Sequence, residues 1–313
     1  MRLQLLHLDD ALKTQPDFIS ASLKKNAYEI DMDAADIRLW GNKNDIKAFA
    51  EKLKKNLRPN GKPVVTFMGS GDFHHVTSLL LECVVPEQSK AAVIHFDNHP
   101  DWVHCKNGVH CGSWVNRANA LPQIEKIVTI GVCSDDLKFP EFKGANLQAM
   151  CAGKLEIYPY FHEATRVFRQ YGKGPGYSQR GGKIEWRNIE AQNADEFITE
   201  ILESISSSEV YVTIDKDVLA HDDAITNWDQ GRMRMPFLMK SLRKIMEKKN
   251  ILGLDVTGDY SVPRYTGPWL TRLKKHIEIK LDQPRLAYDS ATVAKRNAAS
   301  NMALLELFTE CLA

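Results

Sequence analysis

The stretch that decides the fold is AAVIHFDNHPD, residues 91–101, in which an apolar run ends in three ionisable side chains. The apolar half is typical of a strand that is buried on both faces of a parallel sheet. Asp97, His99 and Asp101 follow it directly, and ligands bind just beyond the carboxyl ends of such strands. The spacing of these side chains suits a loop folded around a metal ion. We therefore interpret the stretch as a strand followed by metal ligands.

Two other apolar runs end in the same manner. Residues 64–68 precede GDFHH at residues 71–75, and residues 210–214 precede Asp215 and Asp217. The two aspartates are two positions apart, so on an extended segment they point the same way. Taken alone, such a pair after a strand is more often a turn or a helix cap. The co-occurrence of three clusters favours a metal site, because parallel strands bring their carboxyl ends to one edge.

Four aspartates in one partly buried place carry a large electrostatic cost, which protonation, pairing or bound cations must relieve. Asp97, Asp101, Asp215 and Asp217 would bring four negative charges together, and two divalent ions would balance them. Carboxylates and imidazoles without a thiolate favour manganese-like ions, although zinc, iron and nickel stay open. The sequence therefore predicts two metal ions, with Mn²⁺ preferred.

The three clusters, in this order, resemble those of the ureohydrolase family, which comprises arginase, agmatinase and formiminoglutamase. The resemblance covers about residues 60–262. It implies a three-layer α/β/α fold with a central, mostly parallel sheet, and a binuclear manganese centre. The implied ligands are His74, Asp97, Asp101 and Asp215 for one ion, and Asp97, His99, Asp215 and Asp217 for the other.

A fourth segment, NGVHCG at residues 107–112, resembles the family's loop whose histidine shuttles protons, and it places His110 in that role. The implied reaction is hydrolysis of a linear carbon–nitrogen bond in a guanidine, amidine or amide. A water that bridges two dications has its pKa lowered toward neutrality and would attack as hydroxide. His110 would then protonate the leaving amine.

The sequence departs from the family's pattern at two places. The first cluster has an extra residue, so His74 and His75 compete for the ligand role, and the smallest change favours His74. Where the family has a glutamate that meets the substrate guanidinium, this chain has Gly258, followed by Asp259. Asp259 would replace that glutamate as a catalytic residue only if the backbone shifts. The substrate is therefore open, whereas the metal chemistry is unaffected.

Two alternatives belong to other classes of protein. The first is a metal-dependent deacetylase, because histone deacetylases resemble a related fold that holds a single zinc ion. One zinc ion needs fewer carboxylates than this chain supplies. A non-catalytic arginase-fold protein would bind metal and lack ureohydrolase activity, in line with the missing glutamate. Metal analysis distinguishes the first alternative, and a broad substrate panel distinguishes the second.

Composition narrows the partners. The chain has 313 residues and a formal charge of +1, which points away from nucleic acid and membranes. The partner that the implied reaction requires is a small-molecule substrate. The six cysteines show no framework spacing, which is typical of free thiols in a reducing compartment. With no apolar signal core expected, we predict a cytoplasmic protein. The resemblance makes a homo-oligomer a possibility, although no oligomer motif can be read from these residues.

Strand and helix patterns alternate along the chain, as in a layered parallel sheet. Besides the strand that ends at Asp215, strands are expected at residues 3–8, 37–40, 64–68, 91–96, 126–132 and 251–256, and helices at residues 45–57, 76–83, 112–120, 195–205, 237–248 and 291–312. We expect one domain over residues 1–313, with an insertion or lid at about residues 138–188.

Overall fold

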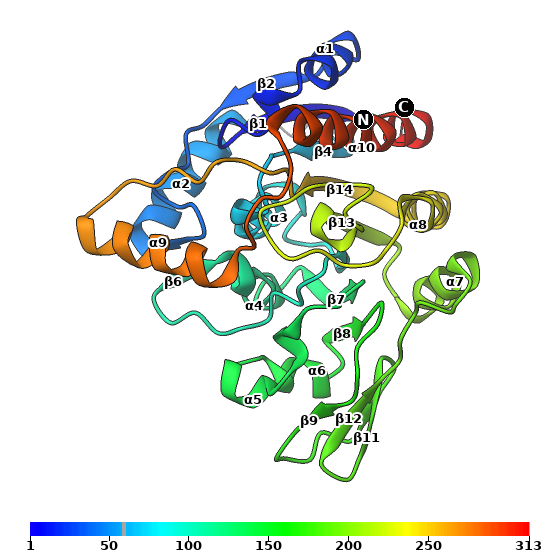
Figure 1. The fold of residues 1–313 in the computed structure, drawn as a ribbon. Coiled ribbons are helices and arrows are strands. Elements are labelled where there is room, and N and C mark those ends of the chain that lie inside the picture. Colours follow the sequence, from blue (N-terminus) through cyan, green and yellow to red (C-terminus); the bar gives the residue numbers. More distant parts are fainter. Residues whose placement is uncertain (58–60, 313) are drawn as a thin grey trace.

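A sheet of eight parallel strands forms the centre of the computed structural model, which describes residues 1–57 and 61–312. The strand order is β2-β1-β4-β14-β13-β5-β7-β8 (Figure 1). The strands are β1 (Arg2–His7), β2 (Tyr28–Asp31), β4 (Val64–Phe67), β5 (Ala91–Phe96), β7 (Ile124–Ile130), β8 (Leu155–Tyr158), β13 (Glu209–Asp215) and β14 (Asn250–Thr257). The predicted central parallel sheet is confirmed.

Helices cover both faces of this sheet. One layer contains α1 (Pro16–Lys24), α7 (Ala194–Ser204), α8 (Met235–Lys248) and α10 (Ser290–Leu312), and the other contains α2 (Lys43–Asn56), α3 (Thr77–Val84), α4 (Trp114–Asn119) and α6 (Leu147–Cys151). Successive side chains of a strand point to opposite faces. Val93 and Ile94 of β5 accordingly belong to different hydrophobic cores. The predicted three-layer α/β/α fold is confirmed.

Local sequence explains where the helices begin and which side they bury. The side chain of Asn42 accepts hydrogen bonds from the first backbone N–H groups of α2. Asn193 does the same for α7, and such caps satisfy donors that the helix leaves unpaired. Ile46, Phe49 and Leu53 lie on one face of α2 and are buried in the core.

The strand expected at residues 37–40 is wrong. Residues 35–39 form a turn and a bend, and Leu39 has a positive φ of 64°, which an extended strand does not tolerate. The chain becomes extended only in β3 (Trp40–Asn42), which pairs antiparallel with β6 (Gly108–His110). The apolar residues that suggested a strand are buried because the turn itself packs inside the molecule.

Residues 138–188 contain more than an insertion. They include α5 (Pro140–Lys143), α6, the edge strand β8 of the main sheet, and a small antiparallel sheet that projects from the molecule (Figure 1). The small sheet comprises β9 (Thr165–Arg166), β10 (Lys173–Gly174), β11 (Tyr177–Arg180) and β12 (Lys183–Trp186). Of this segment's described residues, Lys143 lines the large cavity discussed below. The role of the segment as a lid stays a prediction.

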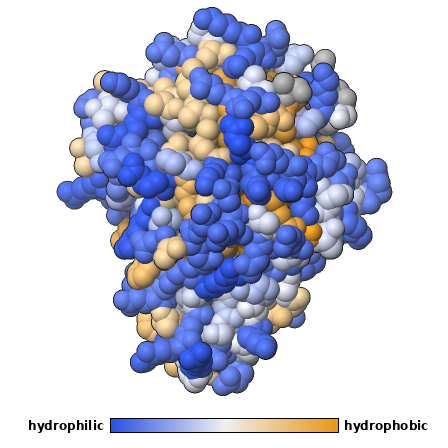
Figure 2. Space-filling view, turned by 90° about the vertical axis from the view of Figure 1, so that its right-hand side faces the viewer, coloured by the Kyte–Doolittle hydropathy of each residue, from blue (hydrophilic) through white to orange (hydrophobic). Residues whose placement is uncertain are grey.

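The outer faces of α7 and α8 are polar. Figure 2 shows this side of the molecule, on which hydrophilic residues predominate. Lys240 of α8 pairs with Asp195 of α7 at 2.7 Å, and Arg243 pairs with Glu310 of α10 at 2.8 Å. Among the described residues, none of the helices combines the length and the apolarity that crossing a bilayer would require.

Candidate metal centre

The three acidic and histidine clusters converge at the carboxyl ends of adjacent strands. The strands β4, β14, β13 and β5 are neighbours in the sheet. Short 3₁₀ helices follow β4 at Gly71–Val76 and β13 at Lys216–Val218, and a loop at residues 97–101 follows β5. Because all four strands are parallel, these segments meet at one edge, where α/β proteins bind their ligands.

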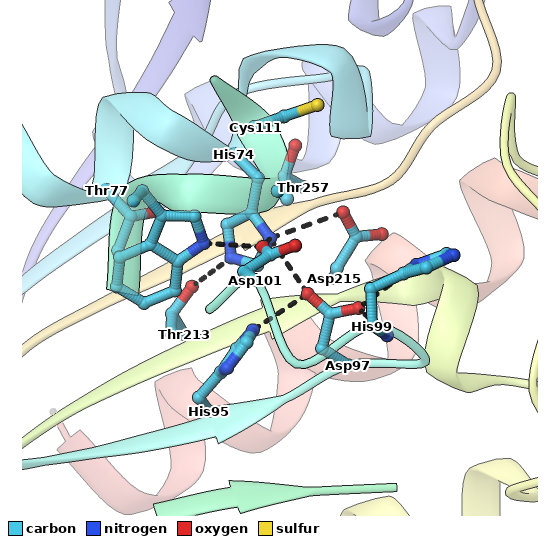
Figure 3. A network of polar contacts seen from close by, with 12 residues as sticks. His74, Thr77, His95, Asp97, His99, Asp101, Cys111, Thr213, Asp215 and Thr257 are labelled. Carbon is cyan, nitrogen blue, oxygen red and sulfur yellow. Dashed lines mark hydrogen bonds and ion pairs between the residues drawn. The ribbon is translucent and has the colours of Figure 1, made fainter. Parts of the chain in front are cut away.

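Asp97 lies in the middle of the cluster (Figure 3). Its Oδ2 atom is 3.0 Å from Nδ1 of His74 and 2.7 Å from Nε2 of His95. Its Oδ1 atom accepts a hydrogen bond from the backbone N–H of His99 at 2.6 Å. The carboxylate therefore connects the end of β5 with the segment that follows β4.

His74, rather than His75, turns its ring toward the carboxylates. The Nδ1 atom of His74 lies 3.2 Å from Oδ2 of Asp101 and 3.5 Å from Oδ2 of Asp215, while its Nε2 atom is 2.9 Å from Oγ1 of Thr213. Both ring nitrogens of the buried His75 lack hydrogen-bond partners among the described residues. Burial lowers the pKa of His75 to about 3, so its ring is neutral. This geometry favours His74 over His75 as the ligand.

His99 and Asp217 form the second half of the centre. The Nδ1 atom of His99 lies 2.9 Å from Oδ2 of Asp217 and 3.6 Å from Oδ1 of Asp97, and its Nε2 atom is 2.9 Å from Oδ1 of Asp229. The Oδ1 atom of Asp215 accepts a hydrogen bond from the backbone N–H of Asp217 at 3.0 Å. This hydrogen bond links the two aspartates that the Asp-x-Asp spacing predicted to lie together.

The donor atoms form two groups with the dimensions of metal sites. Ligand atoms within 4.8 Å of one another come from His74, His95, Asp97 and Asp101 in one group, and from Asp97, His99 and Asp217 in the other. Asp97 belongs to both groups, as expected of a bridging carboxylate. His95 is not among the predicted ligands, because a histidine inside a strand has no sequence signal that separates a ligand from a core residue.

Burial and mutual repulsion perturb the carboxyl groups. Burial raises the pKa of Asp215 to about 7, and the charge of Asp97 adds to this shift. Burial, followed by the charges of Asp215 and Asp97, raises the pKa of Asp217 well above its usual range. Burial, followed by the charge of Asp97, also raises the pKa of Asp101. Cations between these groups would relieve the repulsion, so the donor set fits two divalent ions.

The backbone is closely fitted around the centre. Asp101 has a left-handed backbone with φ of 48°, and its Oδ2 atom accepts a hydrogen bond from the indole of Trp114 at 2.6 Å. Gly258, at the end of β14, has φ of 94°, and a Cβ atom there would collide with Oδ1 of Asp215 and the backbone of Lys216. This strand end therefore has no room for the glutamate that the ureohydrolase pattern places there.

Asp259 lies in a buried network that points away from the cavity. Its Oδ1 atom accepts from Nζ of Lys216 at 2.6 Å and from Nε2 of Gln15 at 3.0 Å, and its Oδ2 atom accepts from Nδ2 of Asn301 at 3.1 Å. Burial lowers the pKa of Lys216, and the charge of Asp259 acts against this shift. Asp259 is not among the residues that line the cavity. This position is that of a structural ion pair and contrasts with the predicted catalytic role.

His110 lies in the wall of a cavity of about 900 Å³. The cavity is also lined by the six predicted ligands, His74, Asp97, His99, Asp101, Asp215 and Asp217. Strand pairing fixes the position of His110, because Trp40 of β3 is its partner in β6. Beyond the predicted residues, the lining includes Glu278 of α9 (Trp269–Asp282), whose Oε1 atom lies 2.5 Å from Nε2 of His110.

Comparison with solved structures identifies the class of fold. Arginase from Bacillus subtilis aligns with a TM-score of 0.60 and 14% identity over 98% of this chain and 97% of that one. Formimidoylglutamase from the same species gives 0.59 and 14% over 98% and 86%. A hypothetical agmatinase from Burkholderia thailandensis gives 0.55 and 16% over 100% and 88%. The chain has the ureohydrolase fold, which confirms the fold that the resemblance implied.

Comparison of sequences gives less information than comparison of structures. No protein-family model matches the chain. An uncharacterised protein from Thermotoga maritima is 27% identical over 198 residues, which make up 62% of this chain and 58% of that protein. The match thus spans less than two thirds of the relative's length. The sequence comparisons thus assign no family, and the arginase-like fold is shown by the solved structures.

Proposed function

We propose that this chain is a metal-dependent hydrolase of a linear carbon–nitrogen bond in a guanidine, amidine or amide. The observation that carries the proposal is the convergence of four buried aspartates with His74 and His99 at one edge of the sheet. Proteins of similar fold are described as an arginase, an agmatinase and a formimidoylglutamase. Fold and donor set thus support the same class of reaction.

The proposed ligands are those that the resemblance implies, and they overlap with the two groups of donor atoms, although Asp215 belongs to neither group and His95 of the first group is not a proposed ligand. One divalent ion takes His74, Asp97, Asp101 and Asp215, and the other takes Asp97, His99, Asp215 and Asp217. Carboxylate and imidazole donors favour Mn²⁺. Bound ions would supply Lewis acidity and make water nucleophilic near neutral pH.

Neighbouring side chains orient the proposed ligands. Nε2 of His95 lies 2.7 Å from Oδ2 of Asp97, and its Nδ1 atom is 3.0 Å from Oγ1 of Thr129. Asp229 lies at hydrogen-bond distance from Nε2 of His99, which leaves Nδ1 of that ring on the side of the centre. Such contacts around ligands fix ring orientation and tune metal affinity.

The rest of the cavity supports a cationic or N–H-rich substrate. The carboxylates that line it in addition to the proposed ligands are Asp135, Asp136, Asp229, Glu278 and Asp282, and Lys143 is the lining lysine. Because Gly258 excludes a side chain at the end of β14, these carboxylates are the groups available to meet positive charge. His110, in the same wall, would exchange a proton with the leaving amine.

A substrate panel with defined metals tests the proposal. We expect Mn²⁺-dependent hydrolysis of at least one guanidine, amidine or amide, measured as released urea, ammonia or amine. Metal binding without any hydrolysis would support the second candidate, a non-catalytic metal-binding protein, which the absent glutamate at Gly258 favours. Hydrolysis of acetylated amines with one zinc ion per chain would support a deacetylase. The homo-oligomer and the cytoplasmic location stay predictions.

A further inference from the structure

Helix α9 turns its polar side toward the molecule and its apolar side toward solvent. Lys275 is the buried residue of the helix, and its Nζ atom donates to the backbone carbonyl of Asp36 at 2.8 Å. The helix lies at the edge of the molecule, outside the three layers (Figure 1). Its exposed side carries five large apolar residues, namely Trp269, Leu270, Leu273, Ile277 and Leu281.

These five side chains form one stripe along the helix. Residues three or four apart lie on the same face of a helix, which aligns Trp269, Leu273, Ile277 and Leu281. The exposed fractions of the five residues run from 45% to 78%. Of the thirteen exposed large hydrophobic residues in the described part of the chain, seven lie within residues 262–286. Soluble proteins rarely expose a contiguous apolar patch that has no binding role.

The segment that carries the stripe is also basic. Residues 262–286 contain six lysines and arginines but two acidic residues, whereas the whole chain has a formal charge of +1. Arg272, Lys274 and Lys280 are exposed, and none of them forms an ion pair with another described residue. The charge of the whole chain, which pointed away from membranes, therefore conceals a local excess of positive charge.

Two of these lysines flank the apolar stripe. With about 3.6 residues per turn, Lys274 and Lys280 project to opposite sides of the line through Leu273, Ile277 and Leu281. A lysine can lay its alkyl stem along apolar surface and keep its ammonium group among polar groups. The exposed face thus has an apolar centre and cationic edges.

We propose that the exposed face of α9 binds an anionic lipid surface. An amphipathic helix of this kind lies in the plane of the membrane, with its apolar side chains at the boundary between head groups and acyl chains. Lysines near the surface meet anionic head groups, and tryptophan is enriched at this depth. Leu281 and Pro284 also line the large cavity, so a bound membrane would lie beside its rim.

The cationic edges favour lipid over a protein partner. A second copy of the chain that packed through the same face would bring the lysines of both copies together, which like-charge repulsion opposes. Lysine is also depleted at protein–protein interfaces. An anionic lipid surface accepts both the apolar stripe and the charges beside it.

Cosedimentation with vesicles tests the proposal directly, and it does not depend on the proposed hydrolase function. We expect the wild type to bind vesicles of phosphatidylcholine mixed with phosphatidylserine, and to bind pure phosphatidylcholine only weakly. Binding should fall as salt is added, because salt screens the attraction. Absence of binding to the anionic vesicles at low ionic strength would overturn the proposal.

Variants on the exposed face separate its two contributions. We expect Trp269→Gln/Leu270→Gln to weaken binding about tenfold or more through lost apolar contact. Lys274→Glu/Lys280→Glu should weaken binding to the anionic vesicles by a similar factor, because it reverses two charges. All four side chains are exposed, so the Tm should stay unchanged.

Leu23→Gln/Lys24→Glu is the matched control, because it replaces an exposed apolar residue and an exposed lysine on α1, which lies apart from α9 (Figure 1). This variant should bind like the wild type. Equal binding by the wild type and Trp269→Gln/Leu270→Gln would overturn the proposal. So would a dimer, measured by light scattering, that Trp269→Gln/Leu270→Gln dissociates, because the face would then belong to a second copy.

Discussion

Lys216 stands between two proposed ligands in the sequence, yet its side chain lies on the opposite side of the backbone. Its ammonium group is buried beneath the centre, 2.6 Å from Oδ1 of Asp259 and 2.9 Å from Oδ1 of Asn301. A buried ion pair depends on both partners, because a single buried charge is costly. We therefore infer that Asp259, through Lys216, supports the segment that carries Asp215 and Asp217.

We expect Asp259→Asn to lower the free energy of unfolding by about 3–5 kcal/mol, because Lys216 would keep a buried charge without a carboxylate. Chemical denaturation measures the change. The double variant Lys216→Met/Asp259→Leu removes both charges and should recover most of the stability. A selective loss of turnover at unchanged stability would instead assign Asp259 a catalytic role.

Single residues also show what could be predicted from the sequence. Asp97, His99 and Asp101 have a spacing that few structural roles explain, and they lie together in the cavity wall. His95 also touches Asp97, but a histidine two positions earlier in a strand reads equally well as a core residue. Glu278 is the clearest omission, because it lies on a segment to which the sequence pattern assigned no element.

Helix α9 is the element that the sequence patterns missed. Its apolar residues are four apart, at Trp269, Leu273, Ile277 and Leu281, which is a helical spacing. The apolar side faces solvent, however, since Trp269 is 69% and Leu281 is 78% exposed. The buried side contains Lys275 instead. A reading that puts the apolar face inward would thus have turned the helix the wrong way and hidden its contact with the cavity.

The burial of Lys275 predicts a pH dependence of stability. Burial lowers its pKa from 10.5 to about 8, against the opposing charges of Asp36 and Asp45. Between pH 8 and pH 10.5 the unfolded chain binds more protons than the folded protein, so the free energy of unfolding rises with pH. We expect the wild type to gain on the order of 1 kcal/mol relative to Lys275→Met between pH 7.5 and 9.5, after allowance for screening by solvent. Parallel stability curves for the two proteins would contradict this explanation.

The strands differed in how well the sequence predicted their positions. The strands β4, β5 and β13 are buried on both faces and read as continuous apolar runs, so their bounds were predicted to within two residues. The two-residue strands of the small sheet are too short for any periodicity. The edge strand β2 is largely exposed and carries charged residues, so it lacks the pattern of a buried strand.

At the scale of the whole molecule, the strand order creates the site. The strands β4 and β5 are separated in the sheet by β14 and β13, which come much later in the chain. Residues 71–76, 97–101 and 215–217 therefore meet only in the folded protein. Their order in the sheet could not be derived from periodicity, and the sequence predicted only that the strand ends meet at one edge. What the fold assembles is a buried concentration of negative charge.

Removal of metal should therefore destabilise the protein in a pH-dependent way. Burial and neighbouring charge raise the pKa of Asp215 to about 7 and that of Asp217 well above its usual range. In metal-free protein, the stability that these groups contribute at low pH is lost as pH rises through their folded pKa values. We expect the Tm difference between Mn²⁺-loaded and EDTA-treated protein to grow from pH 5 to pH 8. A constant difference, measured by scanning calorimetry, would argue against ions at this cluster.

The most direct test of the paired-cation centre is the number of metal ions bound per chain. Elemental analysis after incubation with Mn²⁺ and exhaustive dialysis should find two ions per wild-type chain. We expect Asp97→Ala to retain less than one ion, because Asp97 belongs to both groups of donor atoms. Asp135→Asn is the matched control, since Asp135 lines the same cavity outside both groups, and it should keep two ions. A wild type without bound metal, or an Asp97→Ala protein that retains two ions, would contradict the account.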